Sequence, residues 1–146
     1  MNLKPMSLNQ NSNQPSTSNN IPEWINLNAD ESTSIYFLVF PDKVEAAFNA
    51  VKNSTLPQEI IDDLTAGGTF IKVLTRAGFG VGHTSGEYAT LQGFVFKEVL
   101  GEYNEDFLNI IAPYVLPDSY IEIDEEYRWK FDGFTCRKIY PKLVWE

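Results

Sequence analysis

Hydrophobic and polar positions alternate with a period of two along the C-terminal third of the chain. This alternation is typical of strands with one buried face, and it occupies residues 119–124, 127–131, 135–140 and 142–145. Asp132-Gly133 favours a two-residue hairpin turn. Pro141 marks a bulge or a sheet edge between the last two of these stretches. The pattern predicts an antiparallel meander of three strands.

The region before this meander contains both the strand-like and the helix-like spacing of apolar residues. The continuous apolar run at residues 34–40 predicts a strand buried on both faces, and the alternation at residues 69–75 predicts a second strand. Apolar residues at helical spacing follow Pro41 and predict a helix there. Two further helices are predicted over 57–65 and 104–114.

The segment 86–100 allows two interpretations. Thr84 to Glu87 matches a capping box, and apolar residues follow at helical spacing, so a helix is favoured. Alternation from Gly93 to Val99 leaves a strand possible. The predicted order of elements is β-α-α-β-α-α-β-β-β. We expect a single α+β domain, a mostly antiparallel sheet with a C-terminal three-stranded meander and helices packed on one face.

Residues 1–22 have a different composition. Asn, Gln, Ser, Thr and Pro fill 16 of these 22 positions. Such a segment buries too little apolar surface to offset the entropy of ordering, so we expect a disordered tail at 1–22 and an acidic domain over 23–146.

Composition and charge exclude several classes of protein. The 146 residues carry a net charge of −9, which opposes binding to nucleic acid because that affinity comes from Lys and Arg. A single cysteine, Cys136, allows no internal disulfide, and with one histidine the chain offers too few soft ligands for a zinc site, so we expect no metal and no cofactor. Neither a signal peptide nor a membrane-spanning run is present in the sequence, and a cytoplasmic, membrane-independent protein is expected.

The glycine-rich stretch 78–86 is one candidate site. A strand, a glycine-rich turn and a capped helix can present N–H groups to an anion, with Gly80, Gly82, His83, Thr84 and Ser85 as the ligand-binding residues. The dinucleotide and phosphate-loop spacings are both incomplete here. The alternative is a tight connection whose glycines adopt positive φ. His83 is either a general base or a half-exposed residue without a chemical role, and we assign no catalytic residue.

A cluster of carboxylates in the meander is the other candidate site. Acidic side chains with nearby aromatic residues form a reasonable docking surface for a basic protein. The predicted partner-binding residues are Glu122, Asp124, Glu125, Glu126, Tyr120 and Trp145. The alternative is a solvated charge run that prevents edge-to-edge pairing of sheets.

Two main functions therefore remain, and the sequence also leaves open a structural subunit of a larger assembly. The first is an acidic protein-interaction module that binds, and in its stronger form inhibits, a basic partner. In general character such a chain is similar to small inhibitor or immunity proteins, although no motif carries this similarity and it assigns no residue. The second is a small-ligand or nucleotide-binding domain, or an enzyme, that uses the glycine-rich stretch and His83.

Overall fold

A computed structural model describes residues 29–84 and 90–141 of the chain. Its six strands are β1 (Ser32–Val39), β2 (Phe79–His83), β3 (Leu91–Phe96), β4 (Tyr120–Ile123), β5 (Tyr127–Phe131) and β6 (Cys136–Ile139). Its helices are α1 (Val44–Lys52), α2 (Gln58–Thr65), α3 (Phe70–Arg76) and α4 (Asn104–Ile111), with short 3-10 turns η2 (Pro41–Lys43), η3 (Gly101–Tyr103) and η4 (Ala112–Tyr114).

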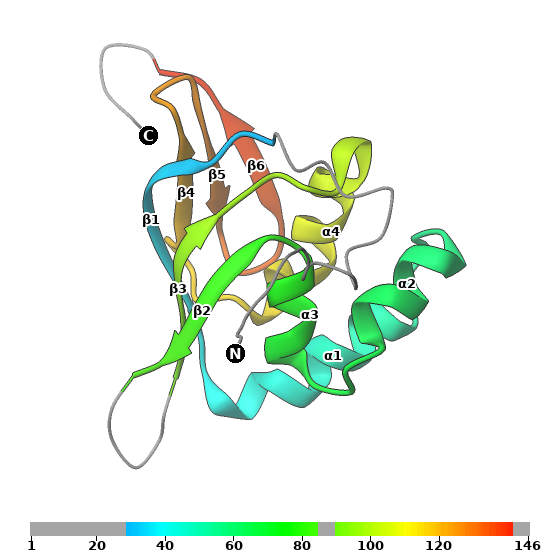
Figure 1. The fold of residues 1–146 in the computed structure, drawn as a ribbon. Helices are drawn as coiled ribbons and strands as arrows, with labels where there is room; N and C mark the ends of the chain where they lie inside the picture. Colours follow the sequence, from blue (N-terminus) through cyan, green and yellow to red (C-terminus); the bar gives the residue numbers. More distant parts are fainter. Residues whose placement is uncertain (1–28, 85–89, 142–146) are drawn as a thin grey trace, which may run out of the picture.

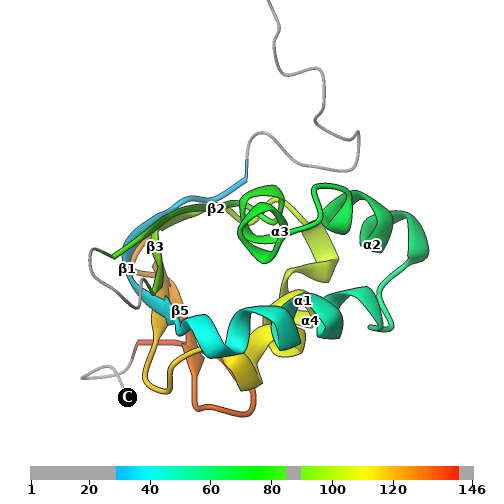
Figure 2. The same ribbon diagram turned by 90° about the horizontal axis from the view of Figure 1, so that it is seen from below.

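The strands form one antiparallel sheet in the order β2-β3-β1-β4-β5-β6. The sheet is curved, and the helices lie together on one side of it (Figures 1 and 2). The predicted α+β class, the antiparallel meander and the helices on one face are confirmed. The predicted disordered tail and residues 142–145 lie outside the described residues.

The core fills the space between the sheet and the helices. Residues that alternate along β4 and β5 point into it, among them Ile121, Ile123, Trp129 and Phe131. Cys136 on β6 is buried with them. Burial of apolar surface, worth about 25 cal/mol per Å², is what fixes the helices against this face.

The prediction of a strand over 69–75 is wrong, because this segment is helix α3. Thr69 caps the helix, since its hydroxyl oxygen accepts a hydrogen bond from the Lys72 N–H at 3.3 Å. Phe70, Val73 and Leu74 are buried at helical spacing. The segment also alternates between apolar and polar residues, so the sequence pattern alone did not distinguish the two structures.

The favoured helix over 86–100 is also wrong, and the strand alternative holds as β3. Thr84 caps no helix here. Its hydroxyl oxygen accepts the Thr90 N–H at 3.0 Å, and its own N–H donates to the Thr90 carbonyl oxygen at 2.9 Å. These bonds join the ends of β2 and β3, which explains why the capping signal failed.

Strand β1 is buried on one face for most of its length, not on both. Phe37 and Val39 point into the core, whereas Tyr36, which precedes them on the opposite face of the strand, is 44% exposed. Gly93 of β3 lies opposite Phe37, and a Cβ there would stand 3.1 Å from the Phe37 ring. The small residue therefore lets the phenyl ring pack across the strand pair.

Candidate functional site

Three of the predicted partner-binding carboxylates lie at the turn between β4 and β5. Asp124, Glu125 and Glu126 are all exposed. Asp124 and Glu125 both have positive φ, at 53° and 60°, and the Glu126 N–H donates to the Ile123 carbonyl oxygen at 2.9 Å. Two successive residues with positive φ are the signature of a type I′ hairpin turn. The turn projects the three carboxylates into solvent at the end of the sheet.

Glu122 does not belong to this exposed set. Its carboxylate accepts a hydrogen bond from Arg128 Nη2 at 2.7 Å in a mostly buried ion pair. It lies on the sheet face turned away from the helices, beside Arg128 and Lys130, so the local charge there is not acidic. Asp124 does not share the strand face of Glu122, because it has left the strand and entered the turn.

Tyr120 lies on the same outer face as Glu122. The Arg128 guanidinium carbon stands 4.5 Å from the centre of the Tyr120 ring, and the Tyr36 ring is 6.4 Å away. Tyr120 therefore packs against its neighbours and is only partly exposed. Trp145 lies outside the described residues.

A carboxylate from the start of the domain joins the acidic turn. Ser32 of β1 pairs with Ile123 of β4, which brings the segment before β1 to the edge where the turn lies. Burial and the hydrogen bond to Glu98 raise the pKa of the Tyr127 phenol far above its usual value, and the charges of Glu98, Asp30 and Glu126 raise it further. We call the exposed set Asp30, Asp124, Glu125 and Glu126 the acidic edge. The place of Asp30 could not be predicted from the sequence, because only strand register reveals it.

Glu98 is hydrogen-bonded to two aromatic residues of β5 and to the segment that carries Asp30. Its carboxylate oxygens each accept one hydrogen bond, Oε1 from the Tyr127 hydroxyl and Oε2 from the Trp129 indole N–H, both at 2.5 Å. The Glu98 N–H donates to the Asp30 carbonyl oxygen at 3.0 Å. Glu98 thereby ties the segment after β3 to β5 and to the start of the domain.

The glycine-rich stretch forms a strand, so the predicted strand, turn and capped helix are absent from the described part of the chain. Gly80 pairs with Val95, and Gly82 with Gln92, in the β2–β3 ladder. Neither has positive φ, whereas Gly78 does, at +112°. Ser85 lies outside the described residues. β2 is an edge strand with an extended backbone, which does not gather successive N–H groups into a nest, so Gly80, Gly82 and His83 lack the geometry that the ligand-binding hypothesis requires.

His83 lies exposed at the end of β2, beside a hollow of about 270 Å³. Apolar residues line most of that hollow, including Phe70, Ile71 and Leu91. Within residues 29–84 and 90–141, no three His, Cys, Asp or Glu side chains cluster as metal ligands. Cys136 is buried, and burial followed by the charges of Glu105 and Asp132 raises the pKa of its thiol, which disfavours the reactive thiolate.

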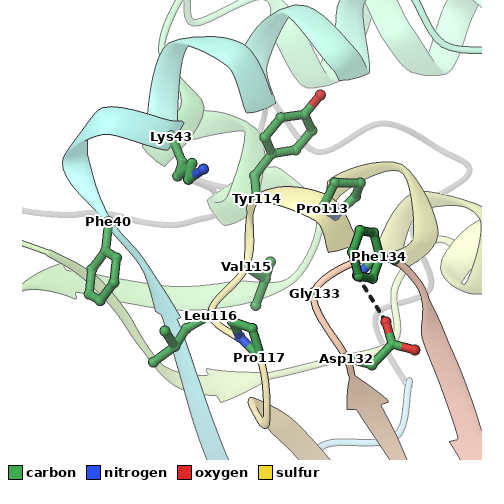
Figure 3. A pocket seen from close by; sticks show the side chains of 10 residues that line it. All are labelled: Phe40, Lys43, Pro113, Tyr114, Val115, Leu116, Pro117, Asp132, Gly133 and Phe134. Atoms are coloured by element: carbon green, nitrogen blue, oxygen red, sulfur yellow. Dashed lines mark hydrogen bonds between the residues drawn. The ribbon is translucent and has the colours of Figure 1, made fainter.

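A second hollow, of about 340 Å³, lies near the first, around the residues that follow β1 (Figure 3). Phe40 and Phe134 stand exposed at its rim, and Lys43 and Pro117 also line it. Asp132 holds the loop that carries Phe134, since its Oδ1 accepts the Phe134 N–H at 2.8 Å. The predicted two-residue turn at Asp132-Gly133 is therefore a longer loop, closed by an aspartate side chain.

No helix in the described residues is long and apolar enough to cross a membrane. No protein-family model matches the chain, and comparisons with curated proteins and with solved structures give no significant match.

Proposed function

We propose that this protein is an interaction module whose acidic edge binds a basic protein surface. The single observation that carries the proposal is the convergence of Asp30 with Asp124, Glu125 and Glu126 at one end of the sheet. These carboxylates come from two segments far apart in the sequence, and the β1–β4 register brings them together. Charge gathered on one surface attracts an oppositely charged partner over about a Debye length, close to 10 Å at 0.1 M salt.

The surroundings of the acidic edge support this function. The two central residues of the turn keep the backbone in a defined hairpin conformation, so little ordering entropy is lost when a partner binds. The β4–β5 hairpin is anchored in the core through Ile121, Ile123 and Trp129. A rigid, exposed and charged turn is suited to fast electrostatic association.

The test begins with capture of a partner on the immobilised full chain at low salt. Binding is then compared for wild type, the double variant Glu125→Lys/Glu126→Lys, and the control Glu45→Lys/Asp62→Lys, which reverses two exposed charges on α1 and α2. We expect the association rate to fall about tenfold or more for the first variant and much less for the control. The wild-type rate should also fall steeply between 20 and 150 mM salt.

Equal association rates for the two double variants, or a rate that does not depend on salt, would contradict the proposal. The acidic edge would then serve only as a solvated end of the sheet. If the captured partner is an enzyme, we expect its activity to fall in proportion to the bound fraction, as the inhibitor hypothesis requires.

A further inference from the structure

The ammonium group of Lys138 rests against aromatic rings instead of a carboxylate. Its Nζ lies 4.2 Å from the centre of the Tyr127 ring and 5.1 Å from that of Trp129. Among the described residues, no carboxylate oxygen lies within 4 Å of this nitrogen. Both distances are within the roughly 6 Å over which a ring face attracts a cation.

Two rings contact the Lys138 ammonium group, and a third ring, that of Tyr140, contacts one of them. The Tyr127 and Trp129 rings stand 6.1 Å apart and 88° to one another, and Tyr140 lies 6.2 Å from Tyr127 at 57°. We call Tyr127, Trp129 and Tyr140 the aromatic cage. Non-parallel aromatic walls around one ammonium group are the arrangement by which proteins recognise alkylammonium ligands.

Glu98 holds two of these walls in place. Its carboxylate accepts the Tyr127 hydroxyl and the Trp129 indole N–H, so both rings are fixed in orientation by the same side chain. A phenol that donates to a carboxylate also becomes more electron-rich, which strengthens the attraction of its ring for a cation. Glu98 therefore acts as a positioning residue for the cage.

The cage is open to solvent on the side where Lys138 enters. Lys138 is exposed, and Tyr140 is 61% exposed. Asp30 and Glu126 of the acidic edge lie close enough to influence the Tyr127 phenol electrostatically. A cation from solvent can therefore reach these rings once the flexible Lys138 side chain moves aside.

We propose that the aromatic cage is a binding site for a lysine side chain of the basic partner, which displaces the protein's own Lys138. This proposal deepens the proposed function and rests on it for the identity of the partner. Lys138 occupies the site in the free protein and shows which chemical group the site accepts. The partner's lysine gains from the acidic edge in addition to the rings.

The first experiment tests the cage without any partner. Trp24 and Trp145 are replaced by Phe, so that Trp129 is the only tryptophan, and its fluorescence is followed during titration with butylammonium chloride or with 1-butanol, its neutral counterpart. In this background Lys138→Ala empties the cage. We expect Lys138→Ala to bind butylammonium at least tenfold more tightly than the parent does, and more tightly than it binds butanol. Tetramethylammonium tests whether methylated amines are also accepted.

Lys138→Met is the matched control. It removes the same charge but keeps an unbranched apolar chain that covers Trp129, so we expect little gain in butylammonium binding. Tyr127→Leu combined with Lys138→Ala should lose most of the gain. A gain equal in Lys138→Ala and Lys138→Met would show a general charge effect and overturn the proposal, as would equal binding of butylammonium and butanol or no saturable change.

The second experiment uses the captured partner. Tyr127→Leu should weaken partner binding mainly through faster dissociation, whereas Glu125→Lys/Glu126→Lys slows association. If Glu125→Lys/Glu126→Lys binds the partner as wild type does, while the emptied cage still binds butylammonium, the proposed function fails and the cage remains a cation site. If the edge variants weaken binding and Tyr127→Leu has no effect on it, the proposed role of the cage in partner binding fails alone.

Discussion

The indole N–H of Trp129 donates a 2.5 Å hydrogen bond to the carboxylate of Glu98, 31 positions earlier in the chain. Trp129 is only 3% exposed, so its N–H has little access to water. A buried donor without an acceptor costs about 1–3 kcal/mol, and bonds to charged groups are stronger than neutral ones. Glu98 consequently contributes to stability as well as to the cage.

Replacing Glu98 should therefore destabilise the fold. We expect Glu98→Ala to lower the free energy of unfolding by about 2–4 kcal/mol, because both Tyr127 and Trp129 lose their acceptor. Glu98→Gln keeps one acceptor oxygen and should cost about 1–2 kcal/mol. Urea denaturation measures both values. In Trp129→Phe the effect of Glu98→Ala should shrink, and an unchanged effect would mean that the indole bond contributes nothing.

The meander could be predicted from the sequence because its signal is local. Ile121 and Ile123, like Trp129 and Phe131, alternate with polar residues, and each strand turns its apolar set to the core. The segment 91–96 could not be assigned in this way, since its apolar residues match both periods. Pairing with β1, which lies more than fifty positions earlier, decides in favour of a strand.

The turn between β4 and β5 offers a stabilising substitution. Glu125 has φ of 60°, a conformation that costs a non-glycine residue about 1–2 kcal/mol. Glu125→Gly removes this cost. Glycine also raises the conformational entropy of the unfolded chain, which offsets part of the gain, so we expect a net stabilisation of about 0.5–1 kcal/mol. The control Glu126→Gly, at a residue without positive φ, should destabilise by a similar amount. Thermal unfolding of both variants decides this, and the same sign for both would contradict it.

Gly78 should be the least replaceable glycine of its stretch. A Cβ at this residue would stand 2.0 Å from the carbonyl oxygen of Lys97, and its φ of +112° already disfavours a side chain. We expect Gly78→Ala to cost about 3 kcal/mol or more in unfolding free energy. Gly68→Ala is the control, because Gly68 has φ of +80° but no atom within 4 Å of the added carbon. It should cost only about 1–2 kcal/mol, and equal losses would show that the close approach to Lys97 relaxes freely.

The candidate site was predictable in part. Asp124, Glu125 and Glu126 form a visible charge run, and their exposure follows from the turn between two alternating segments. The ion pair of Glu122 with Arg128 depends on which residues face each other across β4 and β5. The cage around Lys138 depends further on Glu98, which lies outside the meander, so no pattern within the meander could reveal it.

The loop that carries Phe134 should respond to pH through Asp132. Hydrogen bonds from the Thr135 N–H, the Phe134 N–H and the Thr135 hydroxyl, in that loop, lower the pKa of the Asp132 carboxyl below its usual value. A carboxyl whose pKa is lower in the folded than in the unfolded state stabilises the fold above its unfolded pKa, about 4, and loses this effect as the pH falls through the folded pKa. We expect Asp132→Asn to have a lower thermal midpoint than wild type at pH 7, and this difference to shrink as the pH falls through the lowered pKa of Asp132. Asp132→Ala, which lacks any acceptor for the loop, should stay below Asp132→Asn at every pH. A difference between wild type and Asp132→Asn that stays constant from pH 7 to pH 2.5 would show that the charge of Asp132 does not hold the loop.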